Sequence, residues 1–239
     1  EATIGAGYSS ATKANLQLGI TEDNFLGKGQ QLKFKSSFGD EFTSYDISFA
    51  EPYLYERDLY IKTDLYSELQ DSDTVNYETE KIGFGLALGF PLSYDRRITT
   101  KYSLFNDKTT ADSDATSYEK LLAGTTTVSS VGYSFSSDKR NSPYKPSAGY
   151  KYILNQDLAG LGGDSFFIKS TMDYTYYKRI SKSLIGSIKL NVGHLNGYNN
   201  KYAPISSYFD LGGNKLRGFQ SQRVGPKTGN SYTGGQYFY

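Results

Sequence analysis

Residues 82–90, IGFGLALGF, decide the fold class of this 239-residue chain. Large apolar side chains alternate there with residues no bigger than alanine. A period of two residues is that of a β-strand, whose successive side chains point to opposite faces of the sheet. Five large apolar groups backed only by small residues predict a strand with a lipid-facing surface on one side and a crowded interior on the other.

The same alternation recurs elsewhere, with polar partners. Apolar positions in segments 32–38, 59–69, 166–176 and 184–192 oppose Lys, Asp, Glu, Asn, Gln, Ser or Thr. A soluble sandwich would bury its apolar faces in a shared core. A membrane barrel would turn them towards lipid and its polar faces towards the lumen. Periodicity alone therefore leaves both architectures open.

The lengths of the connections separate these two cases. The pattern predicts strands at 2–9, 14–22, 29–38, 44–50, 58–70, 78–91, 96–106, 121–136, 147–155, 165–178, 183–194 and from 235 onward. Tight connections such as PLSYDRR and RISKS alternate with longer polar ones such as NDKTTADSDATSYEK. Short turns at one end and long loops at the other fit an outer-membrane barrel. The short loop after the first strand and the long SSDKRNSPYKPSAG connection are exceptions, and no helix of convincing length is predicted.

Composition narrows the function classes. Lys plus Arg number 26 and Asp plus Glu 25, so we expect no nucleic-acid partner. The chain has no cysteine, which excludes disulfides and thiolate metal sites. His194 is the only histidine, so a multi-histidine metal site is impossible, and no nucleophile has a credible partner. We therefore expect no metal, no cofactor and no enzymatic activity.

Residues 211–227, LGGNKLRGFQSQRVGPK, carry the strongest functional signal. They are glycine-rich and lie in a long irregular span, residues 195–234. A loop of that length in a compact fold is usually functional or disordered. Its cation Arg217 carries a planar guanidinium, which is suited to gripping a carboxylate inside a protein. The alternative is a surface turn with an incidental arginine.

This segment closely resembles the RGF loop motif of the BamA family, the outer-membrane β-barrel assembly factors. The matching residues are Leu216, Arg217, Gly218, Phe219, Gly225 and Pro226. Three further stretches resemble the family in the same order along the chain: 22–29 (EDNFLGKG), 50–55 (AEPYLY) and 138–149 (DKRNSPYKPSAG). The last of these is similar to a structural turn of the family at Asp138, Arg140, Tyr144, Pro146 and Gly149, where Asp138 and Arg140 could pair.

The resemblance implies an all-β fold, an antiparallel transmembrane β-barrel of sixteen strands preceded by POTRA domains. Residues 1–239 would be a fragment with about eleven to twelve strands, without the POTRA domains and the last strands, and with an open sheet. In the family, the arginine of the RGF loop pairs with an acidic residue on a later strand, which here would lie beyond Tyr239. The first strand would form half of a lateral gate, at Thr3, Ile4, Gly5, Ala6, Gly7 and Tyr8.

The function implied by the resemblance is folding and insertion of β-barrel proteins into the bacterial outer membrane by strand templating. The implied partners are unfolded outer-membrane clients, accessory assembly lipoproteins and the lipid bilayer. One alternative is a two-partner secretion pore or a related protein-translocating pore, although the QS…VGPK continuation favours the assembly factor. A passive porin or a soluble β protein is the third possibility.

Overall fold

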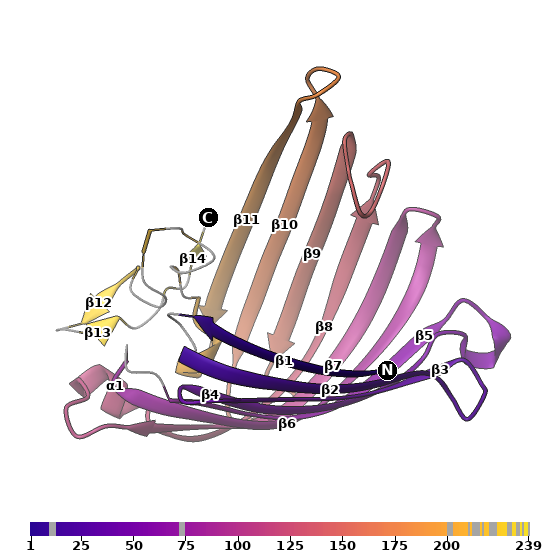
Figure 1. The fold of residues 1–239 in the computed structure, drawn as a ribbon. Coiled ribbons are helices and arrows are strands. Elements are labelled where there is room, and N and C mark those ends of the chain that lie inside the picture. Colours follow the sequence, from indigo (N-terminus) through magenta and orange to yellow (C-terminus); the bar gives the residue numbers. More distant parts are fainter. Residues whose placement is uncertain are drawn as a thin grey trace.

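One open antiparallel sheet dominates the computed structural model (Figure 1). The structure describes residues 1–239 except 10–12, 72–74, 200–202, 210, 212–215, 217, 220–223, 229–230, 233–234, 236 and 239. In sheet order, the strands are β1 (Ala2–Ser9), β2 (Lys13–Phe25), β3 (Gln30–Gly39), β4 (Phe42–Glu51), β5 (Tyr60–Asp71), β6 (Tyr77–Ser93), β7 (Arg96–Ala111), β8 (Gly124–Asp138), β9 (Gly149–Ala159), β10 (Phe167–Arg179), β11 (Ile185–Gly197) and β14 (Tyr237–Phe238). Eleven long strands and a short twelfth confirm the prediction of an all-β, partial barrel.

The observed strands are mostly longer than predicted. β7 extends to Ala111 where the prediction stopped at 106, and β2 extends to Phe25 where it stopped at 22. Backbone pairing continues into these polar ends, for example between Thr109 and Gly124. A ladder of backbone hydrogen bonds does not require apolar side chains. The apolar alternation therefore located each strand but underestimated its length.

The prediction was wrong at residues 121–122, which were assigned to a strand. They belong to a short helix, α1 (Ser117–Leu122), that precedes β8. Thr116 Oγ1 accepts a hydrogen bond from the Glu119 backbone N–H, and a Glu119 carboxylate oxygen accepts one from the Thr116 N–H at 2.7 Å. This reciprocal pair is a capping box, and the T-S-Y-E pattern was its sequence signal. In the described part of the chain, no helix combines the length and the apolar character needed to cross a membrane.

The strand register divides the sheet into two chemically distinct faces. Residues directly opposite each other on neighbouring strands share a face. One row across β2–β7 consists of Ile20, Phe34, Ile47, Leu65, Phe84 and Leu104. The adjacent row consists of Thr21, Lys33, Ser48, Asp64, Gly85 and Ser103. We call the apolar side the outer face and the polar side the lumen face.

The outer face is open. Leu65 is 57% exposed, Ile188 66% and Leu190 42%. The only other sheet in the described residues is the two-stranded pair β12 (Lys227–Thr228) and β13 (Ser231–Tyr232). No described sheet therefore covers the apolar side as a sandwich would. A barrel that turns its apolar face towards lipid accounts for this exposure.

The buried core lies on the lumen face, between the sheet and the segment that follows β11. Its members are Val128, Ala159, Phe167, Leu195, Ala203 and Phe209. A cavity of about 560 Å³ adjoins it, lined mainly by polar residues of β4–β10 and by Ser206 and Ser207. Residues 203–209 of the long loop thus return to the lumen face, and β14 lies beside β11 in Figure 1.

Candidate functional site

The β1 edge has a defined set of outward-pointing backbone groups. Glu1 and Thr21 exchange two backbone hydrogen bonds, with N···O distances of 2.7 and 2.8 Å. Hydrogen-bonded and non-hydrogen-bonded pairs alternate along an antiparallel ladder. Counting from Glu1, the N–H and C=O groups of Ile4, Ala6 and Tyr8 therefore point away from β2. Among the described strands, β1 pairs only with β2, so these groups have no partner within the described residues.

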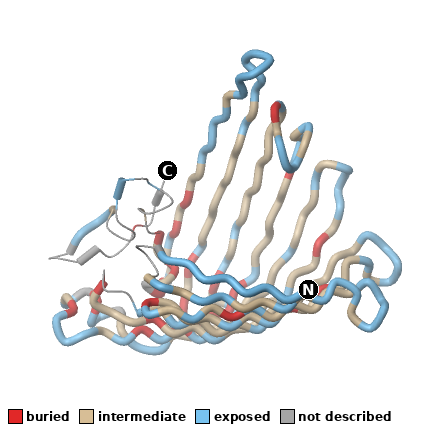
Figure 2. Tube along the Cα trace, viewed as in Figure 1, coloured by how far each residue is buried: buried red, intermediate tan, exposed pale blue. Residues whose placement is uncertain are grey.

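Strand β1 is also weakly packed. Every residue from 1 to 8 is exposed, and Figure 2 shows the strand in pale blue along most of its length. Ile4 is 80% exposed and Tyr8 78%. A Cβ added at Gly5 would meet only the Gln17 Cβ, at 4.0 Å. Packing therefore does not require glycine here, and glycine within a strand weakens it. The predicted gate residues Thr3, Ile4, Gly5, Ala6, Gly7 and Tyr8 all lie on this edge strand.

The RGF segment lies partly within the described residues. Leu216 and Phe219 are 39% and 55% exposed, and the Phe219 N–H donates to the Leu216 carbonyl at 3.4 Å. Gly218 has φ +87° and Gly225 φ +136°, both in a region that favours glycine. Pro226 is exposed beside Gly225. Arg217, the predicted anchor, lies outside the described residues.

A different part of the same loop is docked on the lumen face. It contains the 3₁₀ turn η2 (Ile205–Ser207). Lys169 Nζ on β10 donates to the Ser207 carbonyl at 2.8 Å and lies 4.8 Å from the centre of the Phe209 ring. Ser206 Oγ donates to the carboxylate of Asp107 on β7. These contacts hold residues 203–209 against the wall of the barrel.

Sequence reasoning missed this docking contact. Phe209 is buried in the core cluster, and Asp107 is 1% exposed. The partners are far apart in the sequence: 38 residues separate Lys169 from Ser207 and 99 separate Asp107 from Ser206. No local pattern connects residues at such distances. Lys169 was on the polar face of a predicted strand, but Asp107 lay just beyond the predicted strand 96–106.

The turn between β8 and β9 is ordered by its own polar side chains. Arg140 Nε and Nη2 donate to Asp138 Oδ1 and Oδ2 at 2.8 and 2.6 Å. This hydrogen-bonded carboxylate raises the pKa of the Arg140 guanidinium above its ordinary value. Asn141 Oδ1 accepts from the N–H groups of Ser147 and Ala148 at 2.9 and 3.0 Å.

The remaining residues predicted at this turn have different environments. Gly149 has φ +98°, and a Cβ there would collide with the Lys139 carbonyl oxygen, so the position requires glycine. Pro146 is half-buried, whereas Tyr144 is 94% exposed. The structure thus brings Asp138 and Arg140 into contact and leaves Tyr144 at the surface. The arrangement is structural and offers no reacting group.

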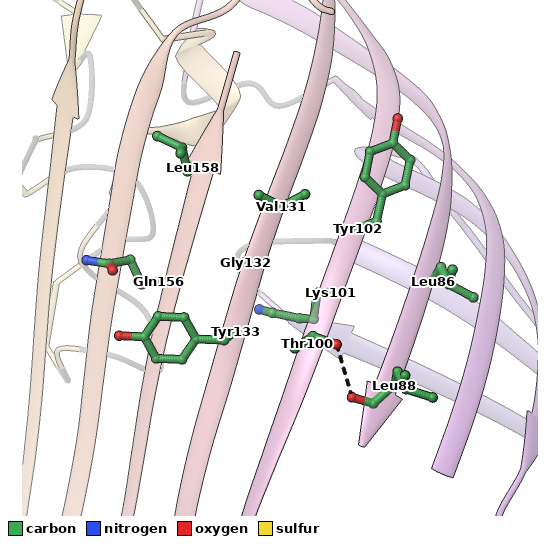
Figure 3. Close-up of a pocket in the computed structure, with 10 residues that line it drawn as sticks. All are labelled: Leu86, Leu88, Thr100, Lys101, Tyr102, Val131, Gly132, Tyr133, Gln156 and Leu158. Carbon is green, nitrogen blue, oxygen red and sulfur yellow. Dashed lines mark hydrogen bonds between the residues drawn. The ribbon is translucent and has the colours of Figure 1, made fainter. Parts of the chain in front are cut away.

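A groove of about 560 Å³ crosses the outer face over β6–β9 (Figure 3). Its apolar lining is Leu86, Leu88, Tyr102, Val131 and Leu158. Two of its polar side chains have hydrogen-bond partners: Thr100 Oγ1 donates to the Leu88 carbonyl at 3.3 Å, and Gln156 Nε2 donates to Ser170 Oγ at 3.1 Å. Such a surface suits hydrocarbon. In the described part of the chain, no three His, Cys, Asp or Glu side chains are grouped to hold a metal ion.

Comparison with known proteins gives consistent matches along nearly the whole chain. The model of the Omp85 superfamily domain matches residues 24–239. The chain is 26% identical over 229 residues to the sorting and assembly machinery component 50 homolog of Mus musculus, covering 95% of this chain and 49% of that protein. It is 24% identical over 227 residues to the outer membrane protein assembly factor BamA of Neorickettsia risticii, covering 94% of this chain and 30% of that protein.

Solved structures share the fold. BamA from Haemophilus ducreyi lacking POTRA domains 1–3 superposes with a TM-score of 0.89 at 21% identity, over 99% of this chain and 51% of that one. CdiB from Acinetobacter baumannii gives a TM-score of 0.55 at 16% identity, over 92% of this chain and 42% of that one.

These matches define the family, although the chain spans about half the length of the Mus musculus relative and less of the BamA sequence. The family match extends from the second strand through the RGF segment, and the backbone follows the BamA structure over nearly all of its length. The chain therefore belongs to the Omp85 superfamily, and its sheet is part of a BamA-type barrel.

Proposed function

We propose that this chain is the barrel portion of an assembly factor that folds and inserts β-barrel proteins into the bacterial outer membrane. The match of residues 24–239 to the Omp85 superfamily domain carries the proposal. The similarity to an outer membrane protein assembly factor and to a sorting and assembly machinery component supports it. Its partners would be unfolded barrel clients, accessory assembly lipoproteins and the bilayer itself.

The proposed mechanism rests on the backbone groups of β1. Ile4, Ala6 and Tyr8 direct donors and acceptors away from β2, where a client strand can satisfy them. In hydrocarbon, each unsatisfied backbone group costs several kcal/mol, so pairing at this edge stabilises a client that has no other partner. Because β1 is glycine-rich and exposed, its register is weakly specified, which suits clients of different sequence.

A proline at Ala6 tests the role of the edge. It removes an outward N–H while leaving the β1–β2 hydrogen bonds in place. In the full-length protein reconstituted into vesicles, Ala6→Pro should slow insertion of a urea-unfolded barrel client about tenfold, the equivalent of one hydrogen bond. The urea midpoint of the assembly factor itself should not change. Ala6→Ser keeps the N–H and is the matched control, so equal insertion rates for the proline and serine variants would overturn the proposal.

The RGF arginine is proposed to anchor the long loop inside the lumen. Its guanidinium would bind an acidic side chain on a later strand of the complete barrel, as the family resemblance implies. Arg217→Ala in the full-length protein should impair assembly far more than Lys201→Ala, a cation from the same loop. Equal, small losses in cellular outer-membrane assembly for both variants would contradict this role.

A further inference from the structure

Two neighbouring turns at one end of the barrel form a strongly basic rim. Residues 138–149, between β8 and β9, and residues 178–185, at the β10–β11 hairpin, carry six cations and one acid: Lys139, Arg140, Lys145, Lys178, Arg179 and Lys182 against Asp138. The turns join each other, because Arg179 Nη2 donates to Ser147 Oγ at 3.0 Å. We call these two segments the basic rim.

The charge is local to this side of the barrel. The other turns at the same end, residues 22–29, 51–58 and 91–97, carry six acids and four cations: Glu22, Asp23, Glu51, Glu56, Asp58 and Asp95 against Lys28, Arg57, Arg96 and Arg97. A general excess of basic residues does not explain the rim, since the whole chain has a net charge of only +1. The asymmetry points to a ligand or surface that faces β8–β11.

Three lysines of the basic rim are exposed to solvent and unpaired with any acid in the described residues. Arg140 is held by Asp138, and Lys139 Nζ lies 3.6 Å from Asp95 Oδ2. In contrast, Lys145, Lys178 and Lys182 are exposed and have no acidic partner within the described residues. Their charges therefore have no counterpart in the described part of the chain.

Exposed apolar side chains lie among these lysines. Tyr144 is 94% exposed, Ile180 64% and Leu184 53%. Ile180 lies over the outer face at Gly186, where an added Cβ would be 2.9 Å from the Ile180 Cδ1. Lys178 pairs in register with the same Gly186, so it also belongs to the outer face. The rim is thus continuous with the apolar surface of the barrel.

The neighbouring tyrosines indicate the level of the rim relative to the bilayer. On the outer face, Tyr174 lies opposite Tyr152, and Tyr176 opposite Tyr150. The rings of Tyr150 and Tyr174 are 6.1 Å apart. Tyrosine belts mark the boundary between hydrocarbon and headgroups. Lys178 follows Tyr176 on the same face, so its ammonium reaches the headgroup layer.

We propose that the basic rim binds anionic phospholipid headgroups of the adjacent leaflet. Lys178 and Lys182 supply the main charge, and Ile180 and Leu184 enter the acyl boundary beside them. Flexible lysines beside apolar side chains suit a diffuse anionic surface, where each cation contributes about fivefold to binding. An acidic protein would fit the charge but would leave the outward-facing Ile180 and its continuity with the apolar belt unexplained.

Lipid selectivity of the full-length protein tests this proposal. The protein is reconstituted into phosphatidylcholine vesicles that contain spin-labelled phosphatidylglycerol or spin-labelled phosphatidylcholine. We expect a preference for phosphatidylglycerol of about 25-fold at low salt, fivefold from each of the two lysines, and a smaller one at high salt. Lys178→Gln with Lys182→Gln should lose most of it, and Lys178→Arg with Lys182→Arg should retain it.

The control variant removes two lysines from the opposite end, Lys108→Gln with Lys120→Gln, and should keep the wild-type preference. Equal binding of the two lipids by the wild-type protein would overturn the proposal. So would a preference that survives in the Lys178/Lys182 glutamine variant. If that variant keeps its lipid preference but fails to recruit accessory proteins, the rim binds an acidic protein instead, and the lipid proposal is wrong.

Discussion

Gly5 of β1 and Gly132 of β8 both face the lumen, but the space around them differs. In register, Gly132 of β8 lies between Lys101 and Asp157 on the flanking strands. Lys101 Nζ reaches Asp157 Oδ1 at 3.3 Å across the glycine. An added Cβ would collide with Asp157 and lie 2.5 Å from the Gln156 carbonyl oxygen. At Gly5 of β1 the nearest atom would be 4.0 Å away.

Glycine has a different structural consequence in each of these two parts of the sheet. In the middle, it permits close packing of long charged side chains over a strand that is paired on both sides. In β1, which has one described neighbour, Gly5 has open space around it within the described residues, and the register is loosely specified. The barrel is therefore tightly packed at β8 and loosely packed at β1, where we propose that clients pair.

The largest effect that this comparison predicts is at Gly132. Gly132→Ala should lower the free energy of unfolding of the full-length protein by about 2 kcal/mol, because the added methyl group overpacks the lumen face. Urea unfolding in phospholipid vesicles measures this change. A midpoint equal to that of the wild-type protein would show that β8 can shift to admit a side chain, and the contrast with β1 would then disappear.

The sequence predicted the strands well because their information is local. The alternation in 82–90 identifies β6 without reference to any other segment, and the pairing of Asp138 with Arg140 spans only two residues. The docking of Phe209 could not be predicted, because its socket is assembled from four different strands. The apolar residues at 121–122 fit the last turn of a helix as well as a strand, and the capping box before them marks the start of the short helix α1.

An intermediate effect is expected from breaking the ion pair above Gly132. Asp157→Asn keeps the volume but removes the charge that faces Lys101, and should cost about 1 kcal/mol because both groups are about two-thirds buried. Asp58→Asn is the control: its partner Arg97 lies 3.2 Å away, but both side chains are more exposed. The urea midpoints of Asp157→Asn and Asp58→Asn are measured at low and high salt. An equal drop in the midpoint of both variants would contradict a special role for the Lys101–Asp157 pair.

The smallest effect on stability is expected at Gly5. Gly5→Ala adds a methyl group in open space, so the free energy of unfolding should change by less than about 0.5 kcal/mol. Alanine also restricts the backbone, which reduces the range of registers that β1 can offer to a client. Client insertion should therefore slow while stability is retained, the reverse of a packing defect. The rate of client insertion and the free energy of unfolding are measured on one vesicle preparation. If Gly5→Ala destabilised the protein as much as Gly132→Ala, β1 would be packed as tightly as β8.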